Sequence, residues 1–283
     1  MALNLGGGSL TSSYSSLYLG NAQSMLSQSL LRLSSGQRIN KPSDDPGGLA
    51  VSMKLKNAIT VTEATKRNVD NALSYTDTQD SALESVADIL DRMSTLKTSY
   101  GSGTATTSDK SSYASEFKEL QKQLDVFKSE TFNSMSLFSS SAVSKQVMIS
   151  SRGESGPTIS ISSLNISGAL SVSSGVNLAN ATGSVTISGI SIGNLTTAIT
   201  QVASLRATSG ATSSRLQFSS DFLDTSKTNL EAANSRIMDV DVADEVTNYA
   251  KYNVQVYAAS AALAQANVNM GIVLDLLNFG SSR

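Results

Sequence analysis

Apolar residues recur at helical spacing most regularly near the two ends of the chain. The N-terminal stripe has intervals of three and four residues and consists of Leu19, Ala22, Leu26, Leu30 and Leu33. The C-terminal stripe has the same intervals and consists of Ala250, Val254, Tyr257, Ala261, Ala264 and Val268. Such stripes are typical of helices that pack against other helices. We therefore expect both stripes to be interface positions on core helices, docked onto a helix from the other end of the chain or from a neighbouring copy.

The first predicted helix covers residues 9–35. Gly36 is expected to end it, because glycine adopts the left-handed conformation without a Cβ clash. A polar connector follows, and the second helix is expected to open at an Asp-Asp-Pro turn. In this turn Asp44 and Asp45 are the predicted capping residues, with Asp45 as the N-cap and Pro46 at the first helical position.

The second predicted helix is the longest element. The chain has no Pro or Gly between Gly48 and Gly101, so we expect a helix of roughly 75 Å. The alternative is an ordinary bundle helix that breaks near residues 76–80. A third helix is predicted to pack antiparallel on the second through Tyr113, Phe117, Leu120, Leu124 and Phe127.

The pattern changes between residues 134 and 193, which are rich in Ser, Gly and Asn. Alternating apolar residues predict short strands and hairpins there, at Ile159 and Ile161, Val185 and Ile187, and Ile190 and Ile192. Helical spacing returns from Leu195, with a heptad repeat at Leu216, Leu223, Leu230 and Ile237. Asp239 or Asp241 is expected to cap the last helix.

These elements predict a mainly α fold. The N- and C-terminal halves should form a long antiparallel helical bundle or coiled coil, with a small β-hairpin region inserted in the middle. We expect terminal helices in residues 1–43 plus 240–283 and a helical rod domain in residues 44–239. The rod domain should include a β-rich segment at about 140–193, and no large outer domain is expected.

Composition argues against most catalytic chemistry. The 283-residue chain has no His and no Cys, which excludes Ser-His and Cys-His nucleophiles, structural zinc sites and disulfides. We expect no enzymatic activity and no catalytic, metal or cofactor site. Charged residues make up 16% of the chain and the net charge is -2, so nucleic acid is not an expected partner. The sequence has no long apolar run and no basic leader, so membrane insertion and a cleaved signal peptide are not expected either.

Four segments, in order and at both ends of the chain, resemble bacterial flagellin. The first contains Arg38–Asn40 and the turn and helix start at Asp44–Ser52. The second is an acidic and apolar helix that ends before Thr131–Asn133. The third is Ser235–Asp241, and the fourth contains Leu263–Asn267. Any one of these segments is a weak signal, whereas their combination is highly specific.

The resemblance implies a structural subunit of the bacterial flagellar filament, which assembles with copies of itself into the tube used for swimming. In that family the terminal helices form a coiled coil in the inner tube, and the next helices form a second layer. Arg38 and Asn40 would then hold the turn between the layers; the alternative is that the turn residues only cap a helix. The terminal segments are expected to be disordered in the monomer and helical in the filament.

The resemblance also implies location and partners. The protein is expected to be extracellular, exported by the flagellar type III apparatus without a cleaved signal peptide. Expected partners besides other copies are the flagellar cap, the hook–filament junction proteins and an export chaperone. Two other functions stay open on the sequence alone. One is a hook–filament junction protein, which would form about one ring of copies, and the other is a helical surface adhesin or coat protein.

Some flagellins are recognised by a toll-like receptor, and the resemblance places Arg92, Leu96 and Glu116 at the matching positions. Ser94 and Thr95 stand where the family usually has an Arg-Glu pair, which argues against receptor binding. The alternative is that Arg92 and Glu116 are solvated or subunit-contact charges.

Overall fold

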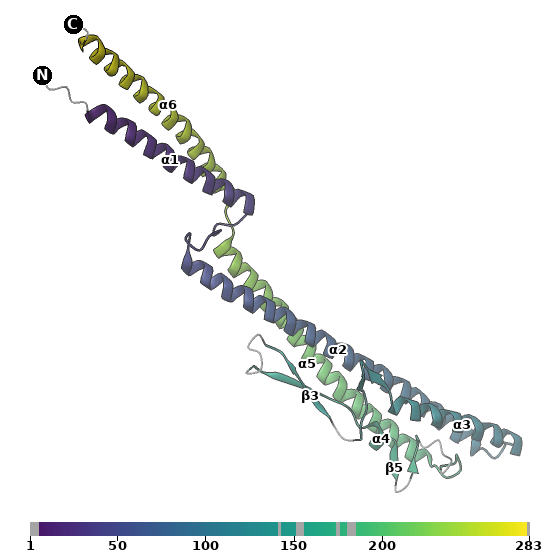
Figure 1. The fold of residues 1–283 in the computed structure, drawn as a ribbon. Coiled ribbons are helices and arrows are strands. Elements are labelled where there is room, and N and C mark those ends of the chain that lie inside the picture. Colours follow the sequence, from purple (N-terminus) through teal and green to yellow (C-terminus); the bar gives the residue numbers. More distant parts are fainter. Residues whose placement is uncertain (1–5, 141–142, 151–155, 174–175, 180–184, 282–283) are drawn as a thin grey trace. The chain divides into compact units, whose positions relative to one another are not determined.

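The structure is a computed structural model whose chain separates into two compact units (Figure 1). It describes residues 6–140, 143–150, 156–173, 176–179 and 185–281. Unit 1 combines Met1–Asn57 with Leu230–Arg283, and unit 2 is Ala58–Asn229. The outermost residues of the predicted terminal segments, 1–5 and 282–283, lie outside the described residues.

Unit 1 contains two long terminal helices, α1 (Gly6–Ser35) and α6 (Val242–Ser281). They lie side by side and run antiparallel (Figure 1). The N-terminal turns of α2 (Pro46–Tyr100) and the C-terminal turns of α5 (Ile192–Met238) complete the unit. Because α2 continues without interruption, the alternative of a break near residues 76–80 is wrong.

Unit 2 consists of the remaining parts of α2 and α5, together with α3 (Thr107–Lys128) and the β region. In unit 2, α2 and α5 run antiparallel, with Arg206 of α5 bound to Asp80 of α2 by two hydrogen bonds of 3.0 Å. The α3 helix starts with a capping box, in which Thr106 and Asp109 each bind the other residue's backbone N–H. This reciprocal cap satisfies two backbone donors that a helix start otherwise leaves unpaired.

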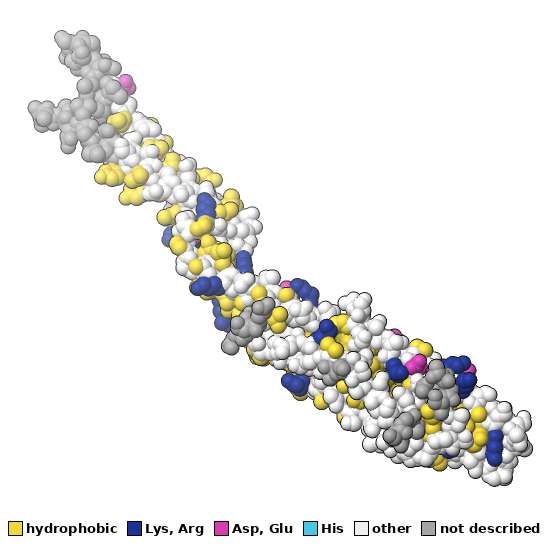
Figure 2. All heavy atoms as spheres, turned by 60° about the horizontal axis from the view of Figure 1, so that its bottom comes forward, with side chains coloured by type: hydrophobic (Ala, Val, Ile, Leu, Met, Phe, Trp, Pro, Cys, Tyr) yellow, Lys and Arg dark blue, Asp and Glu magenta, His cyan; other side chains and the backbone are white. Residues whose placement is uncertain are grey.

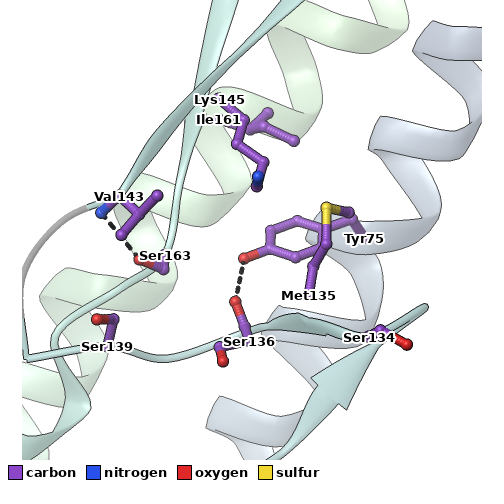
Figure 3. Close-up of a pocket in the computed structure, with 9 residues that line it drawn as sticks. All are labelled: Tyr75, Ser134, Met135, Ser136, Ser139, Val143, Lys145, Ile161 and Ser163. Carbon is purple, nitrogen blue, oxygen red and sulfur yellow. Dashed lines mark hydrogen bonds between the residues drawn. The ribbon is translucent and has the colours of Figure 1, made fainter.

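The β region consists of short antiparallel hairpins. They are formed by β1 (Thr131–Phe132) with β2 (Met135–Ser136), β3 (Ser144–Met148) with β4 (Thr158–Ser162), and β5 (Ser171–Ser173) with β6 (Val176–Asn177); a short helix, α4, spans Ile166–Ala169. Tyr75 of α2 anchors this region, because its hydroxyl donates a 2.9 Å hydrogen bond to the carbonyl oxygen of Ser136 (Figure 3). Burial of this side chain raises the pKa of the Tyr75 hydroxyl.

The predicted extent of the β region, 140–193, differs from the structure. The strands lie between Thr131 and Asn177, and residues 185–190 contain no strand. The alternating residues at 185–190 are buried, but their carbonyl oxygens bind side chains rather than another strand. Gln121 Nε2 donates to Val185 at 3.2 Å, and Lys97 Nζ donates to Ile187 at 2.8 Å. Alternation therefore predicts burial correctly at 185–190 and the backbone partner wrongly. Ile192, the last residue of the predicted pattern, is wrong on both counts, because it is 48% exposed and begins α5.

The apolar core lies in unit 2. Its completely buried side chains include Leu83, Leu90, Met93, Leu124 and Leu195. In unit 1, the described residues include only three buried apolar side chains, those of Ala22, Ile39 and Met238. Within the described residues, no helix has the length and apolarity needed to cross a membrane. The predicted fold class, mainly α with long paired helices and a small β insertion, is confirmed.

Candidate functional site

The seam between α1 and α6 is built mostly from partly buried residues. On α1, Ala22 is buried, and Leu19, Leu26 and Leu33 are partly buried. On α6, the partly buried positions that recur at helical spacing are Tyr249, Tyr252, Val256, Leu263 and Met270. We call these α1 and α6 positions the α1–α6 seam. Since few of its side chains are fully removed from water, the seam contributes little of the apolar burial that stabilises a domain.

One charged side chain is buried in the α1–α6 seam. Glu245 of α6 is only 6% exposed. Its Oε1 accepts a hydrogen bond from the Ser29 hydroxyl of α1, and Arg32 Nη1 lies 3.9 Å from its Oε2. A buried carboxylate needs such partners, because leaving it unpaired is costly. Glu245 therefore ties α6 to one position along α1.

The predicted C-terminal stripe lies outside this seam. We call it the α6 stripe, and it consists of Ala250, Val254, Tyr257, Ala261, Ala264 and Val268, which are all exposed. The side chains of Val254, Tyr257 and Val268 are 66%, 69% and 56% exposed. At 3.6 residues per turn, the stripe and the seam occupy different sides of α6. The helix thus has a second apolar side with no partner among the described residues.

The N-terminal stripe is divided between the two environments. Leu19, Ala22, Leu26 and Leu33 face α6, whereas Leu30 is 55% exposed. Three further large side chains of α1, Tyr14, Leu17 and Tyr18, are each about 60% exposed or more. The space-filling view accordingly shows apolar side chains at the surface of the terminal helices, next to the atoms drawn in grey (Figure 2). Both terminal helices therefore offer apolar surface to another molecule.

The connector between α1 and α2 pairs with the backbone between α5 and α6. Gly36, at φ 70°, ends α1 and donates its N–H to the carbonyl oxygen of Arg32 at 2.9 Å. The backbone N–H of Arg38 donates to Met238 at 2.6 Å, and its guanidinium donates to the carbonyl oxygen of Ile237 at 2.8 Å. Asn40 donates its side-chain N–H to Ser35 Oγ at 2.9 Å. Arg38 therefore holds the connector against the end of α5, and Asn40 holds it against the end of α1.

The two aspartates of the turn have different roles. Asp44 Oδ2 accepts the backbone N–H groups of Asn40 and Lys41 at 3.1 and 3.0 Å. The donors on Lys41 and Asn40 lower the pKa of the Asp44 carboxyl. Asp45 caps α2, because its Oδ1 accepts the N–H of Gly48 at 2.8 Å with Pro46 at the first helical position. Asp44 thus folds the connector, and Asp45 starts the helix.

The three receptor-matching residues lie in two environments. Leu96 is 2% exposed and belongs to the core of unit 2, whereas Arg92 and Glu116 lie at the surface. Arg92 and Glu116 bind each other through hydrogen bonds of 2.7 and 3.0 Å, and this pairing raises the pKa of the Arg92 guanidinium. Their charges are therefore used within the chain, between α2 and α3.

Sequence reasoning missed several residues of this surface. Glu245 lies shortly after the third flagellin-like segment, Ser235–Asp241, and nothing in the apolar spacing assigned it to the seam. Gly48 was also missed: a Cβ there would lie against the Asp45 carboxylate and 2.9 Å from Ile39 Cδ1, so any other residue would displace the Asp45 cap or the Ile39 side chain. Among the described residues, no group of three or more acidic, His or Cys side chains is placed to hold a metal ion.

Comparison with known proteins gives matches along most of the chain. The family described as "Bacterial flagellin N-terminal helical region" matches residues 10–142, and the family described as "Bacterial flagellin C-terminal helical region" matches residues 192–277. The flagellin of Halalkalibacterium halodurans is 30% identical over 87% of this chain and 89% of its own length. The flagellar filament 30.7 kDa core protein of Treponema maltophilum is 28% identical over 95% of this chain and 98% of its own length. A solved structure of a putative flagellar hook-associated protein from Vibrio parahaemolyticus has a TM-score of 0.57 at 13% identity, covers 69% of this chain and 100% of its own, and shows a shared fold alone.

Proposed function

Because the chain belongs to the bacterial flagellin family, we propose that it is a structural subunit of the flagellar filament and that the α6 stripe packs against neighbouring copies. The family is structural rather than enzymatic, and its filament is extracellular. The observation that supports the interface is the exposure of an apolar stripe beside a seam that is already occupied. The stripe is the part of α6 that remains free for a second contact.

Assembly by this route follows from the difference between the two sides of α6. The α1–α6 seam uses one side of α6 within the chain, and the α6 stripe has no partner among the described residues of unit 1, so it is available to a helix of another copy. Burying apolar surface is worth about 25 cal/mol per Å² before the cost of association. A contact that repeats head to tail and does not close gives an open helical fibre. Stacked copies would therefore bury the α6 stripe, which is exposed in the single chain.

The expected partners follow from this function. We propose that copies of the chain are the main partner, and that the flagellar cap, the hook–filament junction proteins and an export chaperone act during assembly. We propose export through the flagellar type III apparatus with no leader removed. A hook–filament junction protein is an alternative that copy number distinguishes, since such a protein would form about one ring per filament. No observation favours that alternative or a surface adhesin.

The α6 stripe can be tested by two matched double variants. Val254→Ser with Tyr257→Ser removes the two most exposed large side chains of the stripe, and Gln255→Ser with Ala258→Ser changes exposed neighbours on the same turns. We expect the stripe variant to give no filaments by negative-stain microscopy at concentrations where the wild type and the control variant polymerise. Circular dichroism should report the same helix content for all three. Long filaments from the stripe variant, at wild-type yield, would refute the proposed interface.

A further inference from the structure

Two phenylalanines on α5 are exposed on unit 2. Phe218 and Phe222, which we call the Phe pair, are 73% and 66% exposed. Phe218 is the most exposed large apolar side chain among the described residues. The two lie one turn apart on the solvent side of α5, since the same stretch packs inward through Leu216 and Leu223. An aromatic pair held in water on a helix that already has a buried side is a surface suited to binding another molecule.

A pocket at α3 has the size and lining to accept an aromatic ring. It measures about 300 Å³, and its lining includes Ala114, Phe117, Lys118, Gln121, Val185 and Ile187. Phe117 and Ile187, at 1% and 3% exposed, belong to the core of the unit. We call this cavity the α3 pocket. A phenyl ring that entered it would contact apolar walls and the ring of Phe117, as aromatic pairs prefer.

The charges beside the Phe pair and beside the α3 pocket are complementary. Asp221 lies next to Phe222, is exposed, and accepts a hydrogen bond from Gln217 at 2.9 Å. Lys118 lines the pocket and is exposed. Neither side chain forms an ion pair within the part of the chain that the structure describes. A carboxylate on one surface and an ammonium group on the other favour one docked orientation.

We propose that the Phe pair of one copy enters the α3 pocket of a neighbouring copy, with Asp221 opposite Lys118. This inference rests on the proposed function, which brings copies of the chain together. It names a contact of unit 2, in addition to the α6 stripe of unit 1. Because the docking sites are two different surfaces of the same unit, every copy offers both and the contact can repeat without limit.

The positions of the two surfaces along α2 require a second copy. Ser220 donates to Asp70 at 3.0 Å, which places the Phe pair beside the turn of α2 that contains Asp70. Glu116 binds Arg92, which places the α3 pocket beside Arg92. At 1.5 Å per residue these two levels of α2 are roughly 30 Å apart. A chain cannot fill this pocket with its own Phe pair.

The same offset favours the α3 pocket over a second candidate. A pocket of about 260 Å³ beside Tyr75 (Figure 3) is also partly apolar, but Tyr75 is within about 8 Å of Asp70 along α2. Parallel copies that joined through two surfaces at one level would gain no rise along the fibre from that contact. Copies that join with an offset of roughly 30 Å rise at every step and form a helical fibre. The proposed function requires the second arrangement.

The first test removes the Phe pair. Phe218→Ser with Phe222→Ser should raise the critical concentration for seeded polymerisation at least about tenfold. Val126→Ser, which removes an exposed apolar side chain of α3 outside the pocket lining, is the matched control and should leave it unchanged. Both variants should keep the wild-type thermal unfolding midpoint, because all three side chains are exposed.

The second test exchanges the charges. Asp221→Lys and Lys118→Glu should each weaken polymerisation, and the chain that carries both changes should return toward the wild-type critical concentration. A purely structural role of either residue would not produce this recovery, because the two residues meet only between copies.

The outcomes separate this contact from the proposed function. If the wild type polymerises and the Phe variant does so at the same critical concentration, the contact is wrong and the filament function stands. If the two charge changes add instead of compensating, the contact is also wrong. If the wild type does not polymerise under seeded conditions, the proposed function fails and this contact fails with it.

Discussion

Unit 1 and unit 2 are built from similar long helices, but they differ in how far they complete their own packing. Unit 2 buries Leu83, Leu90 and Leu124 completely and covers them with α3 and the β region. In unit 1, the longest helices meet along a partly buried seam, and the α6 stripe stays exposed. Under the proposed function, unit 1 would obtain from neighbouring copies the apolar burial that unit 2 obtains within one chain. The comparison teaches that a chain can be divided into a part that folds and a part that assembles.

The largest expected effect comes from the core of unit 2. Leu90→Ala should lower the free energy of unfolding by about 2–5 kcal/mol, because the buried side chain leaves a cavity. Leu26→Ala, in the α1–α6 seam, should leave the main urea transition of the monomer unchanged, because that transition reports unit 2. Amide exchange of the monomer should likewise be fast along residues 10–33 and slow around Leu90. Strong protection of both regions would contradict the proposal that unit 1 completes its packing only in the filament.

A smaller effect is expected where the connector between α1 and α2 meets the start of α2. Gly48→Ala places a Cβ against the Asp45 carboxylate and 2.9 Å from Ile39 Cδ1, so we expect a cost of about 1–3 kcal/mol. Gly47→Ala is the matched control, because the new Cβ meets only Asp45 Oδ1 at 3.5 Å. The control should be neutral or should stabilise the helix by up to about 1 kcal/mol. The melting temperatures of filaments made from the two variants test this difference. Equal values would show that position 48 tolerates a side chain.

The smallest expected effect is a pH dependence. The pKa of Asp44 is lowered from its ordinary value of 3.8, so the ionised carboxylate stabilises the connector at every pH above 3.8. That contribution is lost as the pH falls through the lowered pKa of the folded state. Asp109 in unit 2, whose pKa is lowered by hydrogen bonds from Thr106, should behave in the same direction. Carboxyl titration by NMR checks both, and Asp44→Asn should remove the effect from unit 1 alone; a titration of Asp44 at 3.8 or above would contradict it.

Local chemistry explains what the sequence could predict. The ends of α1 and the start of α2 depend on Gly36, Asp45 and Pro46, and each of these residues acts on its own backbone neighbourhood. The unbroken course of α2 depends on the absence of a helix-breaking residue between Gly48 and Gly101. Such features need no knowledge of distant contacts, so they can be read directly from neighbouring residues.

Distant partners explain what the sequence could not predict. On α6, Tyr252, Val256 and Leu263 recur at helical spacing, and so do Val254 and Tyr257 on another side of the helix. Periodicity therefore identifies the helix and leaves open which side meets α1. The stretch at 185–190 poses the same problem, because its burial depends on side chains of α2 and α3 that lie far away in the sequence.

The buried carboxylate of Glu245 has a consequence for the accuracy of assembly. The rest of the seam consists of Leu, Tyr and other apolar side chains at helical spacing, so a slide by one turn would replace one apolar contact with another at little cost. A slide would remove the carboxylate from Ser29 and Arg32 and leave a charge unsatisfied in a dry place, at a cost of several kcal/mol. One polar residue can thus act as a positional key. In a filament of identical subunits, each subunit is the template for the next. By fixing the register between α1 and α6, Glu245 would keep an error in one subunit from being passed to those that follow.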